Sequence, residues 1–423
     1  MLPHLHIGVR RPAIIRDREE FVVKGRQPPA DDRASAVARP EFGLASALTL
    51  GVSLATVASG VARAGPPADG ADPLAHNRPW QALAAMGDTP ANPQMAAQVA
   101  TFLGRERAAC AAAPSRVPRL PPDAAYRDAL DVIDGLARDA RVVMLNESHV
   151  SRAHRVFLGR LIERLDALGF DALAAETFAP AAPATLADGV PDAATGFYTA
   201  DPAFADALRR AHALGWEFVP YESQVGMARE TREAAQAEAL AAWIEAHPGR
   251  RLLVYAGGSH ISRDPAEGWM AARFVARTGI VPLTIAQGAT ACPDTAGDWP
   301  IDAPSPVVAM RGDAPVRPGP VDLVVLHPPS AVAAAEAARG ARVAVCVAAR
   351  EEPTLLRAFG DGEDDQAIAR DQAEVPAAAT RVELRLPPGR YRIAREDART
   401  LAFLGRVTVD EASAGRCLHV DPL

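Results

Sequence analysis

The segments RVVMLNESHVSR (residues 141–152) and RLLVYAGGSHISR (residues 251–263) decide the fold that we expect. Each starts with an apolar run of strand length and ends in an almost identical serine–histidine pentapeptide, and amphipathic helical stretches lie between them. Strands that alternate with helices are typical of βαβ units. The sequence therefore predicts an α/β fold with a mainly parallel sheet flanked by helices and an internal pseudo-repeat.

A second pair of segments repeats in the same region. ALGFDALAAE (residues 167–176) and ALGWEFVPYE (residues 213–222) each contain a helix end with glycine, a short apolar run and a glutamate at the same offset. The expected strands are thus followed by four polar residues: His149, Glu176, Glu222 and His260. Ligands of open α/β sheets bind outside the carboxyl ends of the strands, so we expect these side chains to converge at one edge.

The chain is expected to have four parts. The run from Phe42 to Val61 is uncharged and mostly apolar, and Ala62-Arg63-Ala64 follows it. This layout is typical of a secretory signal peptide, with a transmembrane anchor as the alternative, and we expect the true start nearer residue 40. After residue 300 the pattern alternates with period two. The expected parts are a leader with a signal peptide (1–64), an N-terminal extension (65–122), an α/β catalytic-like domain (123–300) and a small C-terminal β-rich module (301–423).

Charge and lysine content exclude several classes of function. The formal net charge is -7, without long acidic or basic blocks, which argues against a nucleic-acid partner. Lys24 is the only lysine and lies in the leader, which excludes Schiff-base chemistry and a P-loop. We expect an exported protein, periplasmic or secreted, with a small-molecule or peptide substrate and no stable membrane anchor after signal cleavage.

The cysteines suit an exported protein. There are four, and their spacing contains no C-x-x-C motif that would indicate a zinc or redox site. Disulfides are expected as Cys110 with Cys292 and Cys346 with Cys417, and buried free thiols are the alternative.

The residues at the strand ends suit proton transfer. Histidine is a base near neutral pH, and a neighbouring carboxylate holds its tautomer or acts as a second acid or base. Residues two apart in an extended chain share a face, so Glu147 is expected to face the cleft with His149. Two histidines with glutamates also match a site for a divalent metal. The predicted catalytic residues, which are also the ligands if a metal is bound, are His149, Glu176, His260 and Glu147.

Further residues are candidates for substrate binding. Arginines near the strand ends pair with a substrate carboxylate or phosphate, or they are solvated or paired with nearby glutamates. Ser148 and Ser259 are alternative nucleophiles, but neither lies in G-x-S-x-G, so hydrogen bonding at the strand ends is the favoured role. The predicted substrate-binding residues are Glu222, Arg152, Arg263, Arg229 and Arg232.

Several of these motifs carry a family resemblance. Glu147-x-His149, the Glu176 that closes LGFDALAAE, the helix RETREAAQAEALAAWI and the Gly-x-x-His of GGSHI arrive in a characteristic order. Together, over residues of about 125–290, they resemble the superfamily of erythromycin esterase, Tiki and ChaN-like haem-uptake proteins. The resemblance implies an α/β core with an internal duplication and a pocket at the strand ends.

The resemblance also implies residue roles. His149 matches a general base or metal ligand, Glu176 the carboxylate that assists it, His260 the second histidine and Glu147 the first-strand glutamate. The sequence departs from the family at Asn146, where a glycine is usual, and its Glu147-to-His149 interval is more similar to the ChaN-like version than to the esterase version.

The expected function is hydrolysis of an ester or amide by water activated at a His/Glu centre. In the metal-independent mechanism, His149 takes the proton from water, and His260 stabilises the oxyanion or protonates the leaving group. In a metal-assisted variant, a divalent metal lowers the pKa of bound water. The alternative function is binding of haem or another small ligand by the same two histidines, without catalysis.

Overall fold

The computed structural model describes residues 72–421, apart from 88–89, 113–119, 223–227, 292–298, 300, 318 and 414. All described residues belong to one compact unit, Val61–Leu423. The predicted leader with its signal peptide lies outside the described residues. Within the described part, no helix has the length and apolar character needed to cross a membrane.

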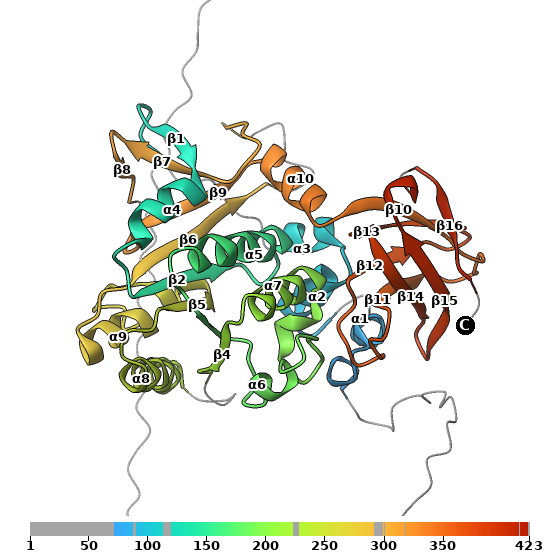
Figure 1. Ribbon diagram of the computed structural model, residues 1–423, viewed down its shortest axis with the longest axis horizontal. Helices are drawn as coiled ribbons and strands as arrows, with labels where there is room; N and C mark the ends of the chain where they lie inside the picture. Colours follow the sequence, from blue (N-terminus) through green and yellow to red (C-terminus); the bar gives the residue numbers. More distant parts are fainter. Residues whose placement is uncertain are drawn as a thin grey trace, which may run out of the picture. The chain divides into compact units, whose positions relative to one another are not determined.

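A large mixed sheet forms the centre of the unit (Figure 1). Its strands are β1 (Ala125–Asp128), β2 (Val142–Glu147), β3 (Ala172–Ala175), β4 (Glu217–Pro220), β5 (Leu252–Gly257), β6 (Leu283–Thr290), β7 (Val307–Arg311), β8 (Ala314–Pro315) and β9 (Leu323–His327). The order is β1-β7-β9-β6-β2-β5-β3-β4, and β8 pairs with β7.

The sheet is parallel only in part. All neighbours from β9 to β4 pair in parallel, as the sequence predicts, whereas β7 pairs antiparallel with β1, β8 and β9. A parallel pair needs a long crossover connection, usually a helix, and the described residues between β7 and β9 form none. The expectation of a mainly parallel sheet is therefore corrected to a parallel core with an antiparallel edge.

Helices cover both faces of the parallel core, because successive residues of a strand point to opposite faces. Val143 and Leu145 of β2 pack with α4 (Ala129–Ala137), α5 (Arg152–Asp166) and α7 (Pro202–Ala213). Val142 and Met144 pack on the other face with α8 (Arg229–Ala246) and α9 (Met270–Thr278). Figure 1 shows α8 and α9 together, apart from α5 and α7. The short α6 (Ala182–Thr185) precedes α7.

The large sheet extends past residue 300, where the sequence predicts the β-rich module to begin, because β7 and β9 belong to the sheet. The β-rich region follows α10 (Pro329–Ala338). It contains a three-stranded sheet, β13-β10-β16, and a four-stranded sheet, β12-β11-β14-β15. The two sheets share one hydrophobic cluster. Their strands are β10 (Ala341–Cys346), β11 (Thr354–Gly360), β12 (Asp371–Val375), β13 (Arg381–Leu386), β14 (Gly389–Glu396), β15 (Leu401–Val409) and β16 (Cys417–His419).

A disulfide joins β10 to β16 within this region. Cys346 and Cys417 are bonded, with their Cα atoms 5.5 Å apart, which confirms the predicted pair. The other predicted pair includes Cys292, which lies outside the described residues.

The N-terminal extension packs against the β-rich region. It forms η1 (Leu74–His76), α1 (Pro79–Met86), α2 (Pro93–Phe102) and α3 (Glu106–Ala112). The carboxylate of Glu396 accepts hydrogen bonds from the backbone N–H groups of Trp80 and Gln81, and buried Arg357 donates to the carbonyl of Asn77 at 2.6 Å. These contacts hold the first helices against β11 and β14.

Candidate active site

The two repeated sequence pairs end on four adjacent strands. The order β2-β5-β3-β4 is parallel throughout, so the carboxyl ends of all four strands meet at one edge. Glu147 and Gly257 are register partners at the ends of β2 and β5. Glu176 directly follows β3, and Glu222 lies just beyond β4. The topology therefore collects the predicted side chains at this edge.

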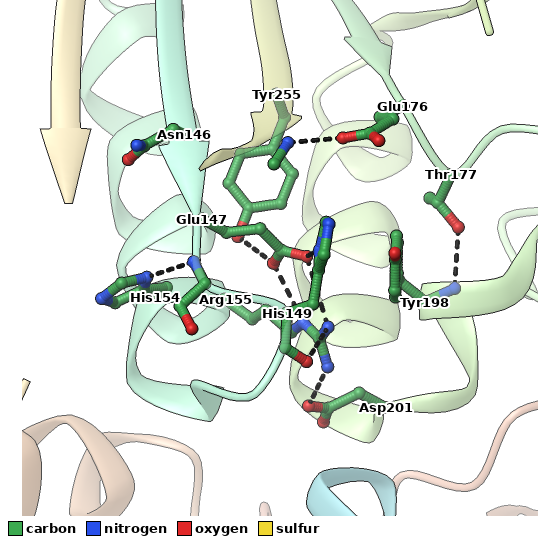
Figure 2. A network of polar contacts seen from close by, with 12 residues as sticks. Asn146, Glu147, His149, His154, Arg155, Glu176, Thr177, Tyr198, Asp201 and Tyr255 are labelled. Carbon is green, nitrogen blue, oxygen red and sulfur yellow. Dashed lines mark hydrogen bonds and ion pairs between the residues drawn. The ribbon is translucent and has the colours of Figure 1, made fainter. Parts of the chain in front are cut away.

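Glu147 and His149 form the first polar pair of the site (Figure 2). The imidazole Nδ1 of His149 lies 2.8 Å from Oε1 of Glu147. Arg155, in the first turn of α5, donates from Nε to Oε2 of Glu147 at 3.0 Å and from a terminal nitrogen to the carbonyl of His149 at 3.1 Å. Tyr255 of β5 donates its hydroxyl to Glu147 at 2.6 Å. The Glu147 carboxylate is thus fully engaged and holds the imidazole in place.

The charge of Glu147 is fixed by these contacts. Burial opposes ionisation, but the Arg155 guanidinium and the bond with His149 outweigh burial and lower the pKa of Glu147 to about 2. Asp201 accepts a hydrogen bond from Arg155 at 2.7 Å, so two carboxylates surround this buried guanidinium. Glu147 therefore stays a carboxylate at neutral pH.

The second nitrogen of His149 faces the end of β5. A Cβ added to Gly257 would lie 2.4 Å from Nε2 of His149 and 3.0 Å from Oε2 of Glu176. Any side chain at position 257 would therefore displace both groups. Because glycine has no side chain, the His149 imidazole and the Glu176 carboxylate can both lie close to the backbone of Gly257.

Glu176 connects the two histidines. Its Oε2 accepts from the backbone N–H of Gly257 at 2.5 Å, and its Oε1 lies 2.7 Å from a terminal nitrogen of Arg232 and 3.5 Å from Nε2 of His260. Burial opposes ionisation, but the hydrogen bond and charge of His260 and the backbone N–H of Gly257 hold the pKa of Glu176 well below its usual value.

His260 is held from the other side by a buried glutamate that the sequence analysis does not select as catalytic. Its Nδ1 lies 2.9 Å from the Glu233 carboxylate on α8. Burial opposes the charge, but hydrogen bonds with Glu176 and Glu233 raise the pKa of His260 to about 9. His260 is therefore an imidazolium at neutral pH.

The predicted substrate-binding residues divide into two groups. Arg232 binds Glu176 and also Glu222, so these two predicted residues belong to the cluster. Arg229 lies at the start of α8, half exposed, with its guanidinium 4.7 Å from the ring centroid of Trp269, which in turn packs edge-on against His260.

Arg263 lies away from the cluster, and Arg152 contacts it only through a 3.6 Å ion pair with Asp201. Arg263 pairs with Asp322 before β9 at 2.5 Å. Arg152 points toward the N-terminal extension and donates to the carbonyl of Thr101 at 3.4 Å. The matching arginines of the two pentapeptides thus have different partners. Arg152 is the first residue of the long helix α5, whereas Arg263 follows the short helix η3 (Gly258–Ile261).

Five residues of the site escaped the sequence analysis: Arg155, Tyr198, Asp201, Glu233 and Tyr255. Tyr255 is the register partner of Leu145 and so shares a sheet face with Glu147, but the sequence repeat aligns it with Met144 on the other face. Tyr198 and Asp201 come from the irregular segment between β3 and α7, where no periodic signal exists. The departure at Asn146 also has a structural role, since its side chain accepts from the backbone N–H of Gln287 at 2.6 Å and donates to the carbonyl of Gly258.

The carboxylates of the cluster do not suit a metal. Arg155 and Tyr255 occupy both oxygens of Glu147, and Arg232 and a backbone N–H occupy those of Glu176. Among the described residues, no group of three or more His, Cys, Asp or Glu is arranged to hold a metal ion.

Comparison with known proteins gives only distant structural likenesses. No family model matches the chain, and no curated protein matches it in sequence. The chain is similar to the type III effector HopBA1, with a TM-score of 0.34 and 17% identity over 51% of this chain and 99% of that chain. It is also similar to RRSP, a MARTX toxin effector domain from Vibrio vulnificus CMCP6, with a TM-score of 0.29 and 16% identity over 38% of this chain and 36% of that chain. Both neighbours are bacterial effector or toxin proteins, and the resemblance to the erythromycin esterase superfamily stays a prediction.

Proposed function

We propose that this chain is an exported hydrolase in which His149 activates water to cleave an ester or amide bond. The observation that carries the proposal is the contact between Nδ1 of His149 and the buried, ionised Glu147. A carboxylate at Nδ1 favours the tautomer with the proton on Nδ1, which leaves Nε2 as the proton acceptor. This Nε2 faces the strand edge beside Glu176, where the repeated segments meet.

The other half of the cluster supplies positive charge. His260 is protonated at neutral pH, and the guanidinium of Arg232 lies 3.5 Å from its Nε2. A carbonyl oxygen that gains negative charge as water attacks is stabilised by such fixed cations. In the proposed reaction His149 takes the water proton, and His260 or Arg232 faces the developing oxyanion. The His149 imidazolium then returns the proton to the departing alkoxide or amine as the acyl–O or acyl–N bond breaks.

Two further observations support the proposal. The motif order of Glu147, His149, Glu176 and His260 resembles a superfamily that includes esterases. The Cys346–Cys417 disulfide fits export, since structural disulfides persist mainly in oxidising compartments. The substrate class that suits the site is an ester or amide of a small molecule or peptide.

The test is turnover of a panel of 4-nitrophenyl esters and peptide 4-nitroanilides by the full chain and by His149→Asn. Loss of the general base is expected to lower kcat/KM by about 10²–10⁴-fold with the fold retained by circular dichroism. His419→Asn, which changes an exposed histidine of the β-rich region, is the matched control and should retain activity. Equal turnover in His149→Asn contradicts the proposal. A wild type that is inactive on the whole panel but gives a His149-dependent Soret band with haem favours the binding alternative.

A further inference from the structure

A cavity of about 460 Å³ lies at the N-terminus of α5, and His149 is not among its lining residues. Residues of α3, the end of β6, α10 and the β-rich region complete its walls. This volume falls within the usual range for small-molecule sites. Its lining includes Glu106, Ser151, Arg152, Val332, Ala333 and Glu336.

The floor of the cavity carries hydrogen-bond donors without partners. Ser151 and Arg152 are 9% and 7% exposed, and the Ser151 hydroxyl and the Arg152 Nε have no hydrogen-bond partner among the described residues. Ser151 occupies the N-cap position of the 15-residue helix α5, but its side chain makes no capping bond. Buried donors without acceptors cost about 1–3 kcal/mol each, and a helix N-terminus adds a partial positive charge. Together these groups match a bound carboxylate.

Arg152 forms two long ion pairs, with Asp201 and with Glu106. Its Nε lies 3.6 Å from Asp201 and 3.8 Å from Glu106, both beyond hydrogen-bond distance. The first of these carboxylates is already bonded to Arg155. The Nε of Arg152 therefore lacks a hydrogen-bond acceptor, although both carboxylates pair with its charge.

The cavity also contains two glutamates, of which Glu106 lies beside Arg152 and Glu336 pairs with Arg339 at 3.3 Å. Glu106 and Glu336 both line the cavity, and burial together with the charge of Glu336 raises the pKa of Glu106, although Arg152 opposes this shift. A ligand with a carboxylate alone would meet these two glutamates. A ligand that also carries an ammonium group would relieve their repulsion. The remaining walls contain Arg342 and Arg385 and an apolar part that includes Val150, Ala291, Pro329, Val332 and Ala333.

We infer that this cavity binds a zwitterionic small molecule with an apolar body, namely an apolar amino acid or dipeptide. The carboxylate lies at Ser151, Arg152 and the N-terminus of α5, and the ammonium group lies at Glu106 and Glu336. The inference does not depend on the proposed hydrolysis, because none of the residues at Nε2 of His149 lines the cavity.

The test is ligand binding to the full chain by thermal shift and isothermal titration calorimetry. The probes are L-leucine, L-phenylalanine and the dipeptide Leu-Leu, with N-acetyl-leucine and leucine amide as derivatives that lack one charge each. At least one zwitterion is expected to bind saturably, and each derivative should bind at least about tenfold more weakly, as the loss of a charged hydrogen bond implies.

Variants locate the site. Ala333→Trp fills the cavity and should abolish binding, whereas Ala334→Trp, at the next exposed position of α10 and outside the lining, should not. Ser151→Ala should weaken binding while leaving the ligand-free Tm unchanged or higher, because it removes a buried hydroxyl that has no partner. A merely structural serine would lower Tm instead. The inference is overturned if no zwitterion binds at about 10 mM, if the derivatives bind equally well, or if Ala333→Trp and Ala334→Trp bind alike.

Discussion

The phenol ring of Tyr198 stacks on the imidazole of His149, with ring centroids 4.1 Å apart and planes 12° from parallel. Tyr198 lies in the short helix η2 (Phe197–Ala200), and its backbone N–H donates to the hydroxyl of Thr177 at 2.7 Å (Figure 2). The ring is therefore fixed by a residue that directly follows Glu176. Burial and the charge of Glu176 raise the pKa of Tyr198, so the phenol stays neutral.

This stacking predicts different results for two substitutions of Tyr198. Tyr198→Phe keeps the aromatic ring that stacks on His149 and should retain kcat within about twofold. The stacking energy, about 0.5–1.5 kcal/mol beyond burial, is unchanged in this variant. Tyr198→Ala frees the imidazole and should lower kcat by about tenfold or more. Steady-state hydrolysis by both variants is the measurement. A phenylalanine variant as inactive as the alanine variant would show that the hydroxyl, and not the ring face, is required.

His260 predicts an alkaline limit of activity. Its pKa is raised to about 9, so the imidazolium is present below that pH and is lost as pH rises through it. If its charge stabilises the transition state, kcat/KM falls above about pH 9. The same group stabilises the fold fully below its unfolded pKa of about 6.5, and this contribution disappears as pH rises through about 9. The measurements are a pH–rate profile and an NMR titration of the His260 ring.

Glu233→Gln is the matched variant for that prediction. It removes one of the carboxylates that hold the imidazolium, so the alkaline limb should move to lower pH by roughly 1–3 units. Glu238→Gln changes an exposed glutamate on the same helix, which binds Arg277, and should leave the profile unchanged. If the alkaline limb of the pH–rate profile does not move in Glu233→Gln, the limb belongs to a group other than His260.

The sequence predicts the strand-end cluster but not the detail of its contacts. Apolar periodicity and the two repeats are local signals, and the parallel order of β2, β5, β3 and β4 then brings Glu147, Glu176 and His260 to one edge. The repeats are nevertheless not equivalent. The two pentapeptides are offset by 111 residues, from Ser148 to Ser259, whereas β2 and β5 pair with Glu147 opposite Gly257. His260 therefore lacks a glutamate of its own strand and pairs with Glu233 from α8 instead.

Helix phase and irregular segments explain the remaining errors. The sequence selects Arg152, yet Arg155, one turn later on α5, is the arginine that faces Glu147. The residue of the first turn of α5 that faces the sheet depends on where the helix begins. The short sequence pattern before the helix does not determine this starting point. The antiparallel edge arises from β7, a pairing between distant segments that leaves no local signal.

The disulfide predicts a specific loss of stability. Cys346 and Cys417 are 71 residues apart, so their bond constrains most of the β-rich region in the unfolded chain. The double variant Cys346→Ser/Cys417→Ser should lower the free energy of unfolding by about 2–4 kcal/mol. Urea denaturation measures the loss, and peptide mapping without reductant should recover the two cysteine peptides joined. Alkylation of both thiols in the unreduced native protein would contradict the bond.

The buried pair of Glu147 and Arg155 predicts a coupled loss of stability and activity. Glu147→Gln keeps the shape of the side chain but removes the negative charge that balances the fully buried Arg155 guanidinium. The free energy of unfolding should therefore fall by about 3–5 kcal/mol. Because the pKa of Glu147 is lowered to about 2, its contribution is present above the unfolded pKa of about 4.5 and is lost as pH falls through about 2.

The matched control for Glu147→Gln is Glu163→Gln, which removes an exposed carboxylate that pairs with Arg210 on the surface and should cost less than about 1 kcal/mol. Urea unfolding at several pH values should therefore give a lower free energy of unfolding for Glu147→Gln than for Glu163→Gln at pH 7, and the two values should converge in acid. Activity should separate them as well, because only Glu147→Gln releases Nδ1 of His149. A Glu147→Gln variant that is as stable and as active as Glu163→Gln would show that the buried carboxylate neither balances Arg155 nor orients the base.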